Sequence, residues 1–172
     1  MLLIAKSLRE LDFRQLMDVY EEGNRENARQ QYLQLPEGQG IGEVEQDFYA
    51  FLKAGFFSVP GAFYATWTVD RRYVSALRME PYRDGWLVEA VETKPDCRRN
   101  GYASSLMKAV FDVLQVGKVY SHIHKKNLPS QKLHEGLGFR RCADQAVYID
   151  GSVNDRCATY LLELGERVCP RN

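Results

Sequence analysis

The stretch RRNGYASSLMKAV, residues 98–110, joins a loop to the start of a helix. From Tyr102 onward, apolar residues recur at helical spacing, which predicts one inward face and one polar face. The inward positions are Leu106, Met107, Val110, Phe111 and Leu114, and the outward ones are Ser104, Lys108, Asp112 and Gln115. Directly before them stands Arg98-x-x-Gly101-x-Ala103, in which the glycine allows another group to approach the backbone closely. The stretch therefore predicts a helix whose N-terminus faces a ligand.

This loop has the chemistry of an anion-binding site. The first turn of a helix has four backbone N–H groups without intrahelical partners, and the helix dipole is positive there. Ala103 keeps the first turn free of bulk, while Arg98 and Arg99 can add positive charge. A pyrophosphate would fit. The sequence contains neither G-x-x-x-x-G-K-[ST] nor G-x-G-x-x-G, which argues against ATP hydrolysis and NAD binding. Taken alone, the loop is equally typical of a strand-to-helix turn with two solvated arginines.

Upstream of the loop, the period of the sequence changes twice. Residues 62–69, 73–79 and 86–93 are rich in aromatic and β-branched residues and predict an antiparallel meander of three strands, which Pro95 ends. Before it, residues 4–11 can form a first strand. Asp12 and Gln15 resemble a capping box for a helix that ends near Gly23 or Ala28. After a glycine-rich bend at residues 36–42, a second helix is expected to stop at Gly55.

Downstream, Gly117 should stop the central helix, and the remaining segments complete a sheet. Residues 118–124 read as a strand, residues 129–137 as a short helix, and residues 139–149 and 155–164 as a closing hairpin. The predicted order is βααβββαβαββ. Strands on both sides of one central helix indicate an α/β fold, with a mixed, mostly antiparallel sheet flanked by helices in a single domain, residues 1–172.

The composition limits the possible partners. The chain has 23 basic and 23 acidic residues, so no overall charge recruits nucleic acid or an anionic membrane. Four widely spaced cysteines without a C-x-x-C pair are typical of a reducing environment, and no apolar run is long enough for a signal peptide or membrane span. We therefore expect a cytoplasmic protein, either a monomer or a homodimer, without nucleic-acid or membrane partners.

A second segment, NLPSQKLHEGLGF at residues 127–139, gives the loop its context. The order of elements, Pro95, the Arg98-x-x-Gly101-x-Ala103 signature and this segment together resemble the GNAT superfamily of acyl-CoA-dependent N-acyltransferases over nearly the whole chain. The resemblance implies that acetyl-CoA is the co-substrate and that a primary amine, on a small molecule, peptide or protein, is the acceptor. It also implies direct attack of the amine on the thioester, without a covalent enzyme intermediate.

The same resemblance implies the binding residues. The strand before the signature would splay from the next strand, so that the backbone of Val91 and Thr93 binds the pantetheine arm, which Asn127 would also contact. The loop and first helical turn would hold the pyrophosphate. Its expected ligands are Arg98, Arg99, Asn100, Gly101, Tyr102 and Ala103. Unpaired backbone groups on such a strand suit an amide-bearing ligand, which binds them as another strand would.

The catalytic residues are less clearly marked. The family usually has a tyrosine seven residues after Asn127, where it protonates the leaving thiolate, but this sequence has His134. A histidine could donate a proton near neutral pH. Alternatively, His134 lies on an exposed helix face and water is the donor. For the base, strand alternation places Glu89 with Val91 and Thr93. His122, on the following strand, ranks level with Glu89.

Several alternatives stay open at this stage. Glu92 should point away from Glu89 and ranks lower as a base, and each candidate could instead have a structural role. A metal held by His122, His124 and His134 is not expected, because no acidic or cysteine ligand completes the set. Cys97 has no nearby base and reads as a loop residue.

The acceptor is not specified by the sequence. By resemblance, it would contact the first two helices, whose acidic and aromatic residues suit a cationic amine. These residues are Tyr20, Glu21, Glu22, Glu26, Tyr32, Phe48, Tyr49 and Phe51. Solvated glutamates and core aromatics are the simpler explanation. A non-catalytic acyl-CoA-binding or regulatory module of the same fold is the alternative function, whereas a nucleic-acid binder using Arg98, Arg99, Arg140 and Arg141 is disfavoured.

Overall fold

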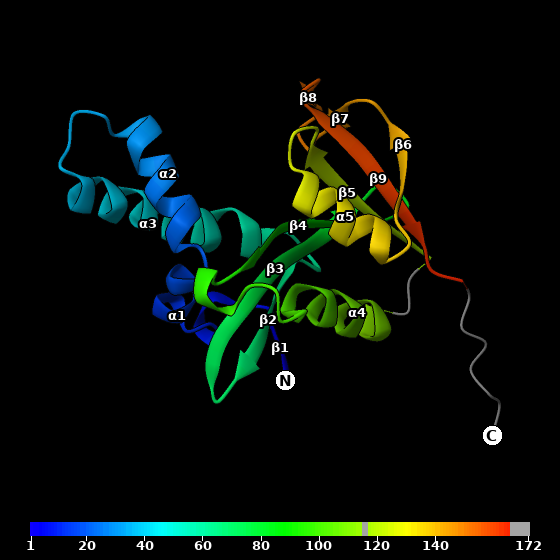
Figure 1. The fold of residues 1–172 in the computed structure, drawn as a ribbon, viewed down its shortest axis with the longest axis horizontal. Helices are drawn as coiled ribbons and strands as arrows, with labels where there is room; N and C mark the ends of the chain where they lie inside the picture. The colour runs from blue at the N-terminus through cyan, green and yellow to red at the C-terminus, as the bar shows by residue number, and fades with distance from the viewer. Residues whose placement is uncertain (115–116, 166–172) are drawn as a thin grey trace.

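The computed structural model describes residues 1–114 and 117–165, and its centre is a twisted, seven-stranded sheet (Figure 1). The strand order is β1-β2-β3-β4-β5-β9-β6, and every pairing is antiparallel except that of β4 with β5. The strands are β1 (Leu2–Ala5), β2 (Phe63–Val69), β3 (Arg72–Tyr82), β4 (Gly85–Thr93), β5 (Lys118–His124), β6 (Arg140–Ala143) and β9 (Cys157–Glu163). The predicted mixed, mostly antiparallel sheet is confirmed.

Helices cover both faces of the sheet. α1 (Phe13–Val19), α2 (Glu21–Gln31) and α3 (Glu37–Ala54) lie on one side, and α4 (Tyr102–Leu114) and α5 (Leu128–Gly136) on the other (Figure 1). Short 3-10 turns occur at Leu8–Glu10, Phe56–Ser58 and Pro95–Cys97. In the described part of the chain, no helix is long and apolar enough to span a membrane.

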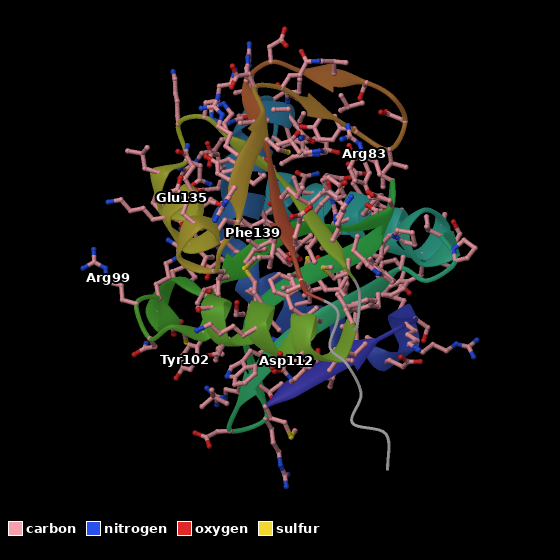
Figure 2. All side chains as sticks on the ribbon, turned by 90° about the vertical axis from the view of Figure 1, so that its right-hand side faces the viewer. Arg83, Arg99, Tyr102, Asp112, Glu135 and Phe139 are labelled. Atoms are coloured by element: carbon pink, nitrogen blue, oxygen red, sulfur yellow. The ribbon has the colours of Figure 1, made fainter. Side chains whose placement is uncertain are left out.

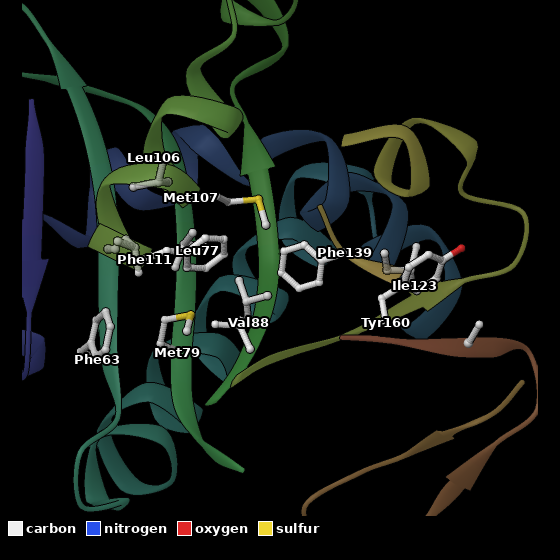
Figure 3. Close-up of a cluster of buried hydrophobic side chains, with 14 residues drawn as sticks. Phe63, Leu77, Met79, Val88, Leu106, Met107, Phe111, Ile123, Phe139 and Tyr160 are labelled. Atoms are coloured by element: carbon white, nitrogen blue, oxygen red, sulfur yellow. The ribbon is translucent and has the colours of Figure 1, made fainter. Parts of the chain in front are cut away.

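Two apolar clusters hold these layers together. The larger one lies between the sheet and α4, whose inward residues Leu106, Met107 and Val110 are completely buried, as the helical spacing predicted. Figure 3 shows the Phe139 ring in this cluster between Val88 of β4 and Ile123 of β5. The other cluster lies on the α1–α3 side. It contains Leu16, Leu52, Phe56 and Tyr64, each at most 1% exposed.

The first third of the chain differs from the prediction in three places. The first strand ends at Ala5, because the Glu10 carboxylate accepts hydrogen bonds from Lys6 N and Ser7 Oγ and folds the following residues into a turn. The predicted Asp12 cap is confirmed, with Gln15 N donating to Asp12 Oδ1 at 3.1 Å.

The predicted first helix is in fact two helices, α1 and α2, which meet at Tyr20 (φ −92°, ψ 9°). The expected bend at residues 36–42 is wrong, because these residues form the first turns of α3. Gly40 is buried there, and a Cβ atom at this position would lie 3.4 Å from Tyr32 Cβ and 3.5 Å from Ala28 Cβ of α2. The glycine therefore serves close helix packing. The expected stop at Gly55 is confirmed.

The closing hairpin is also more divided than predicted. β6 and β9 do pair, but a separate ribbon of β7 (Ala146–Val147) and β8 (Val153–Asn154) stands between them in the sequence. The Tyr82 hydroxyl donates to the carbonyl of Val147, which ties this ribbon to the end of β3. The expected outward position of Gln115 lies outside the described residues.

Candidate functional site

The strands β4 and β5 are close at one end and diverge at the other. Gly85 starts β4 so near to β5 that a Cβ atom on it would collide with the carbonyl of Lys118. Pairing then runs from Trp86↔Val119 to Val88↔Ser121 and stops. From residue 89 on β4 and residue 122 on β5, the two strands are no longer paired with each other. We call these diverging segments, residues 89–93 and 122–124, the wedge.

A β-bulge shapes the β4 side of the wedge. Arg78 pairs with Glu89 and Ala76 with Glu92, so Leu77 on β3 faces two residues of β4, Ala90 and Val91. Ala90 has φ +50°, a left-handed conformation that costs a non-glycine residue about 1–3 kcal/mol. The Tyr20 hydroxyl donates to the Ala90 carbonyl at 2.6 Å and holds the bulge from the junction of α1 and α2.

The bulge overturns the predicted order of side chains on β4. Because one extra residue is inserted, alternation is interrupted between Glu89 and Val91. Val91 packs against the cluster on the α4 side, and Thr93 Oγ1 donates to Ser75 Oγ. Glu89 and Glu92 instead share the α1–α3 face. The expectations that Glu89 lies with Val91 and Thr93, and that Glu92 points away from Glu89, are therefore wrong.

The loop before α4 has the geometry expected of an anion site. Gly101 has φ +76°, and a Cβ atom placed on it would meet nothing within 4 Å, so the space in front of its backbone is open. The Gly101 carbonyl accepts from Ser105 N at 2.9 Å, which leaves the first-turn N–H groups of Tyr102 and Ala103 without helical partners. No acidic residue occupies this first turn. Arg99, with φ +64°, is exposed and extends away from the loop (Figure 2).

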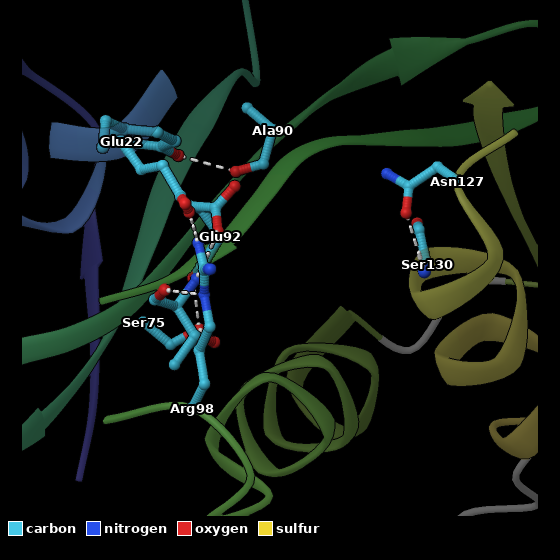
Figure 4. Close-up of polar contacts among 9 residues, drawn as sticks. Glu22, Ser75, Ala90, Glu92, Arg98, Asn127 and Ser130 are labelled. Atoms are coloured by element: carbon cyan, nitrogen blue, oxygen red, sulfur yellow. Dashed lines mark hydrogen bonds and ion pairs between the residues drawn. The ribbon is translucent and has the colours of Figure 1, made fainter. Parts of the chain in front are cut away.

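Arg98 has a different environment from the one expected. Its guanidinium donates to the carboxylates of Glu22, on α2, and Glu92 (3.1 Å), and to the carbonyl of Thr93 (3.2 Å) (Figure 4). Its charge is thus already matched by two acids. Asn100 Nδ2 donates to the carbonyls of Cys97 and Arg98 and shapes the loop. Arg98 therefore connects α2, β4 and the loop, and its role as a pyrophosphate ligand stays a prediction.

Asn127 is the N-cap of helix α5, which carries His134. Asn127 Oδ1 accepts from Ser130 N at 3.1 Å (Figure 4), and its Nδ2 makes no hydrogen bond within the described residues. His134 is only 1% exposed, so the alternative of an exposed helix face is wrong. Its ring packs 4.9 Å from that of Phe139, and Nδ1 lies 2.8 Å from the Ser130 carbonyl.

These contacts define the protonation state of His134. A carbonyl only accepts hydrogen bonds, so Nδ1 carries the proton and Nε2, which is buried without a partner in the described chain, carries a lone pair. Burial lowers the pKa of His134 below its usual 6.5, against a smaller opposite effect of the Ser130 hydrogen bond. At neutral pH the ring therefore has no proton to give from Nε2. The expected donation to a thiolate finds no support in this geometry.

His122 and Glu89 lie on the same face, at the point where β4 and β5 first separate, and we call this opening onto the α1–α3 face the mouth of the wedge. Both ring nitrogens of His122 are buried and have no hydrogen-bond partner in the described residues. The ring packs edge-on against Tyr82 (5.5 Å) and Tyr148 (5.3 Å). Burial lowers the pKa of His122, although the charge of Glu89 opposes the shift. The imidazole is therefore neutral at pH 7 and able to accept a proton.

Glu80 belongs to the same group, although the sequence analysis missed it. Glu89 pairs with Arg78 at 3.2 Å, with side-chain exposures of 18% and 21%. Glu80 lies beside Glu89, and burial, a hydrogen bond with Glu89 and the charge of Glu89 together raise the pKa of Glu80 to about 7. The spacing of Arg78 and Glu80 along β3 already placed both on one face.

The candidate acceptor residues are largely engaged elsewhere. Phe48 packs against Phe13, Tyr20 and Phe51, and the Arg78 guanidinium lies 5.0 Å over the Phe51 ring, which is 43% exposed. All three candidate glutamates line an open groove of about 600 Å³ beside Pro95. The groove is lined by Glu21, Glu22, Arg25, Glu26, Arg29 and Pro95. The Tyr32 hydroxyl donates a hydrogen bond to Asp47 Oδ2, and the Tyr49 ring packs edge-on against the Phe13 ring.

The three histidines do not converge. His124 Nδ1 accepts from Lys126 N at 3.1 Å, and His122 and His134 pack in different clusters. Among the residues that the structure describes, no group of three or more His, Cys, Asp or Glu side chains could hold a metal ion.

Burial and the neighbouring Asp96 raise the pKa of the Cys97 thiol, which donates to Asp96 Oδ1.

A β-edge without a strand partner, beside a helix N-terminus with open space before it, is the arrangement expected of acyl-CoA-dependent transferases. The sequence profile described as the acetyltransferase (GNAT) family matches residues 13–139, most of the chain, and the chain belongs to this family. Its members use acetyl-CoA as acyl donor and amines as acceptors. The unpaired edge at residues 89–93 and the open space before Gly101 fit that donor.

Solved structures support the fold. An acetyltransferase from Thermus thermophilus has a TM-score of 0.66 at 15% identity and covers 95% of this chain and 97% of its own. The PaiA N-acetyltransferase from Thermoplasma acidophilum, in complex with coenzyme A, has a TM-score of 0.64 at 12% identity, and the match covers 95% of this chain and 99% of that one. The ribosomal-protein-S18-alanine N-acetyltransferase from Escherichia coli has a TM-score of 0.59 at 17% identity, and the match covers 98% of this chain and 99% of that one. No curated protein matches the sequence of this chain.

Proposed function

We propose that this protein is an N-acetyltransferase that moves the acetyl group of acetyl-CoA to a primary amine by direct attack of the amine on the thioester. The observation that carries the proposal is the wedge itself: β4 and β5 separate after Val88 and Ser121, next to the open Gly101 loop, with His122 and Glu89 at its mouth. Acetyl-CoA supplies the activated acyl group. The chain supplies binding, orientation and proton transfer.

The donor-binding roles follow from position. The backbone of Val91, which has no partner on β5, offers hydrogen bonds to the pantetheine arm, and the free Nδ2 of Asn127 offers another from α5. The Thr93 N–H and carbonyl bond to Glu92 and Arg98, so Thr93 would bind the arm by exchanging these partners. The backbone N–H groups from Arg99 to Ala103 hold the pyrophosphate, with the Arg99 side chain free to add charge. In this proposal Arg98 orders the loop through Glu22 and Glu92.

The acid–base roles are divided between two residues at the mouth of the wedge. Glu89 carries the negative charge that binds an incoming ammonium group. His122, neutral and with two unpartnered ring nitrogens, accepts the proton that the amine must lose before attack. Water protonates the leaving thiolate, and His134 holds α5 against Phe139.

The test is acetyl-CoA turnover in the presence of a panel of amines, with release of the free thiol as the signal. We expect His122→Asn to lower kcat by about 10²-fold or more, the usual contribution of a general base. His134→Gln, which keeps a donor to the Ser130 carbonyl, should retain turnover within a few-fold. The assignment of His134 would be wrong if it lost as much activity as His122→Asn.

The alternative is a non-catalytic acyl-CoA-binding module, and the missing proton donor on His134 is the observation that favours it. The same assay separates the two functions. Tight binding of acetyl-CoA, measured calorimetrically, without thiol release for any amine in the panel would establish the module and refute the transferase.

A further inference from the structure

Charged side chains beside the wedge do not balance. Arg78, Glu80 and Glu89 lie together on the α1–α3 face. The side chains of the ion pair, Arg78 and Glu89, are about four-fifths buried. Two acids and one guanidinium leave one negative charge without a partner. A charge withdrawn from water without a partner is costly, so the group must bind either a proton or an external cation.

No other described group supplies that cation from within the protein. His122 faces the group from β5, but burial keeps it neutral. The hydroxyls of Tyr20 and Tyr64 contact one another, and Tyr148 bonds to Asn154, so these three are neutral at pH 7. Arg83 lies 5.0 Å over the Tyr82 ring and 5.6 Å over the Tyr120 ring, and its charge contributes to the lowered pKa of His122. Its side chain is exposed, so water screens its charge, and no ion pair joins it to Glu80 or Glu89 among the described residues.

The walls around this charge suit an organic cation. His122 packs between Tyr82 and Tyr148, and Phe51 lies beneath the Arg78 guanidinium. Aromatic rings attract alkylammonium groups through their faces. The unmatched charge and these rings lie at the same mouth of the wedge, where the proposed reaction needs the amine.

We propose that Glu80 is a specificity-determining residue that acts through Glu89, so that the acceptor site selects aliphatic amines in their cationic, alkylammonium form. The inference rests on the proposed function and extends it to a substrate class. When both carboxylates are ionised, the ammonium group replaces the proton that the pair otherwise shares. Glu89 contacts the substrate, and Glu80 is a positioning residue.

The proton balance is complete with groups already named. The ammonium N–H bond breaks and the proton passes to His122, which leaves a nitrogen lone pair to form the bond to the thioester carbon. The C–S bond then breaks, and the thiolate keeps the electron pair. The nitrogen loses a second proton as the amide forms, one proton ends on the thiolate, and one is released to water.

The experiment compares benzylamine, which is cationic at pH 7.5, with O-benzylhydroxylamine, which has a similar shape but is neutral. In Glu80→Gln we expect KM for benzylamine to rise about tenfold or more, with kcat within a few-fold, because one ionic contact is lost. KM for the neutral amine should not change. Glu80→Asp should restore part of the difference, and Glu135→Gln, on α5 on the opposite side of Figure 2 from Arg83, is the matched control.

The pH profile gives an independent result. In the wild type, KM for benzylamine should fall as pH rises through about 7, because Glu80 loses its proton there. In Glu80→Gln this dependence should disappear. Equal effects on both amines, or an unchanged pH profile, would overturn the inference.

A binding measurement separates this inference from the proposed function. With CoA present, benzylamine should raise the melting temperature of the wild type but not of Glu80→Gln. If no amine is acetylated but this difference is found, the site is a cation site and the transferase proposal fails. If amines are acetylated with equal selectivity in both proteins, the transferase stands and the role of Glu80 fails.

Discussion

Replacing Tyr20 by phenylalanine should weaken both the fold and CoA binding, because one hydroxyl serves two partners. It donates to the Ala90 carbonyl at 2.6 Å and accepts from the Tyr64 hydroxyl at 2.9 Å. Tyr64 is completely buried, so its hydroxyl would be left unsatisfied at a cost of about 1–3 kcal/mol. For a chain of this size, each kcal/mol lowers Tm by roughly 2–4 °C.

The effect on CoA has a separate origin. Without the Tyr20 hydroxyl, the left-handed Ala90 is no longer held by a side chain, and relaxation of the bulge would move the unpaired edge of β4. We expect the Kd for CoA, measured by calorimetry, to rise by about three- to tenfold, which corresponds to the typical net value of one hydrogen bond.

Two controls make this prediction specific. Tyr73→Phe removes a hydroxyl that accepts from Asp12 N at 3.1 Å and makes no contact with the bulge at Ala90, so it should cost stability without changing CoA affinity. The double variant Tyr20→Phe/Tyr64→Phe removes both hydroxyls of this pair, so neither is left unsatisfied, and it should recover stability but not affinity. A Tyr20→Phe protein with the predicted loss of stability and a normal Kd would show that Tyr20 does not hold the bulge.

Two further predictions concern the loop and α5. Gly101→Glu should abolish the rise in Tm caused by acetyl-CoA, because the side chain and its charge enter the open anion site, whereas Gly38→Glu, in similarly open space on α3, should preserve it. Below pH 6.5 the unfolded chain binds protons that buried His134 does not, so stability should fall with pH. His134→Gln should therefore show a smaller drop in Tm between pH 7.5 and 5.5, and an identical drop would contradict the buried, neutral imidazole.

Local patterns in the sequence predicted the elements that carry strong periodicity. The helix from Tyr102, the strand at 118–124 and the three-strand meander agree with the structure, because each buries one face that its own residues define. Gly40 was misread as part of a bend. Its partner Ala28 belongs to another helix, and only that contact makes the glycine favourable within a helix.

The candidate site was predicted unevenly. Glu89 and His122 were predicted as equally ranked alternatives for the base, and the structure brings both to the mouth of the wedge. Glu80 was missed, because its proximity to Glu89 depends on the pairing of β3 with β4. Arg98 was expected to carry free charge, yet Glu22, a residue 76 positions away in the sequence, binds it.

The sequence by itself determined the place of the strand-to-helix loop and of its left-handed glycine, since Arg98-x-x-Gly101-x-Ala103 ahead of a helical period requires only local geometry. Only the tertiary structure decided which carboxylates share a face. The bulge at Ala90 adds a residue to β4, and a bulge depends on the neighbouring strand and on the distant Tyr20 hydroxyl. It also decided the state of His134, because burial against Phe139, rather than the residue type, removes the proton from its outer nitrogen.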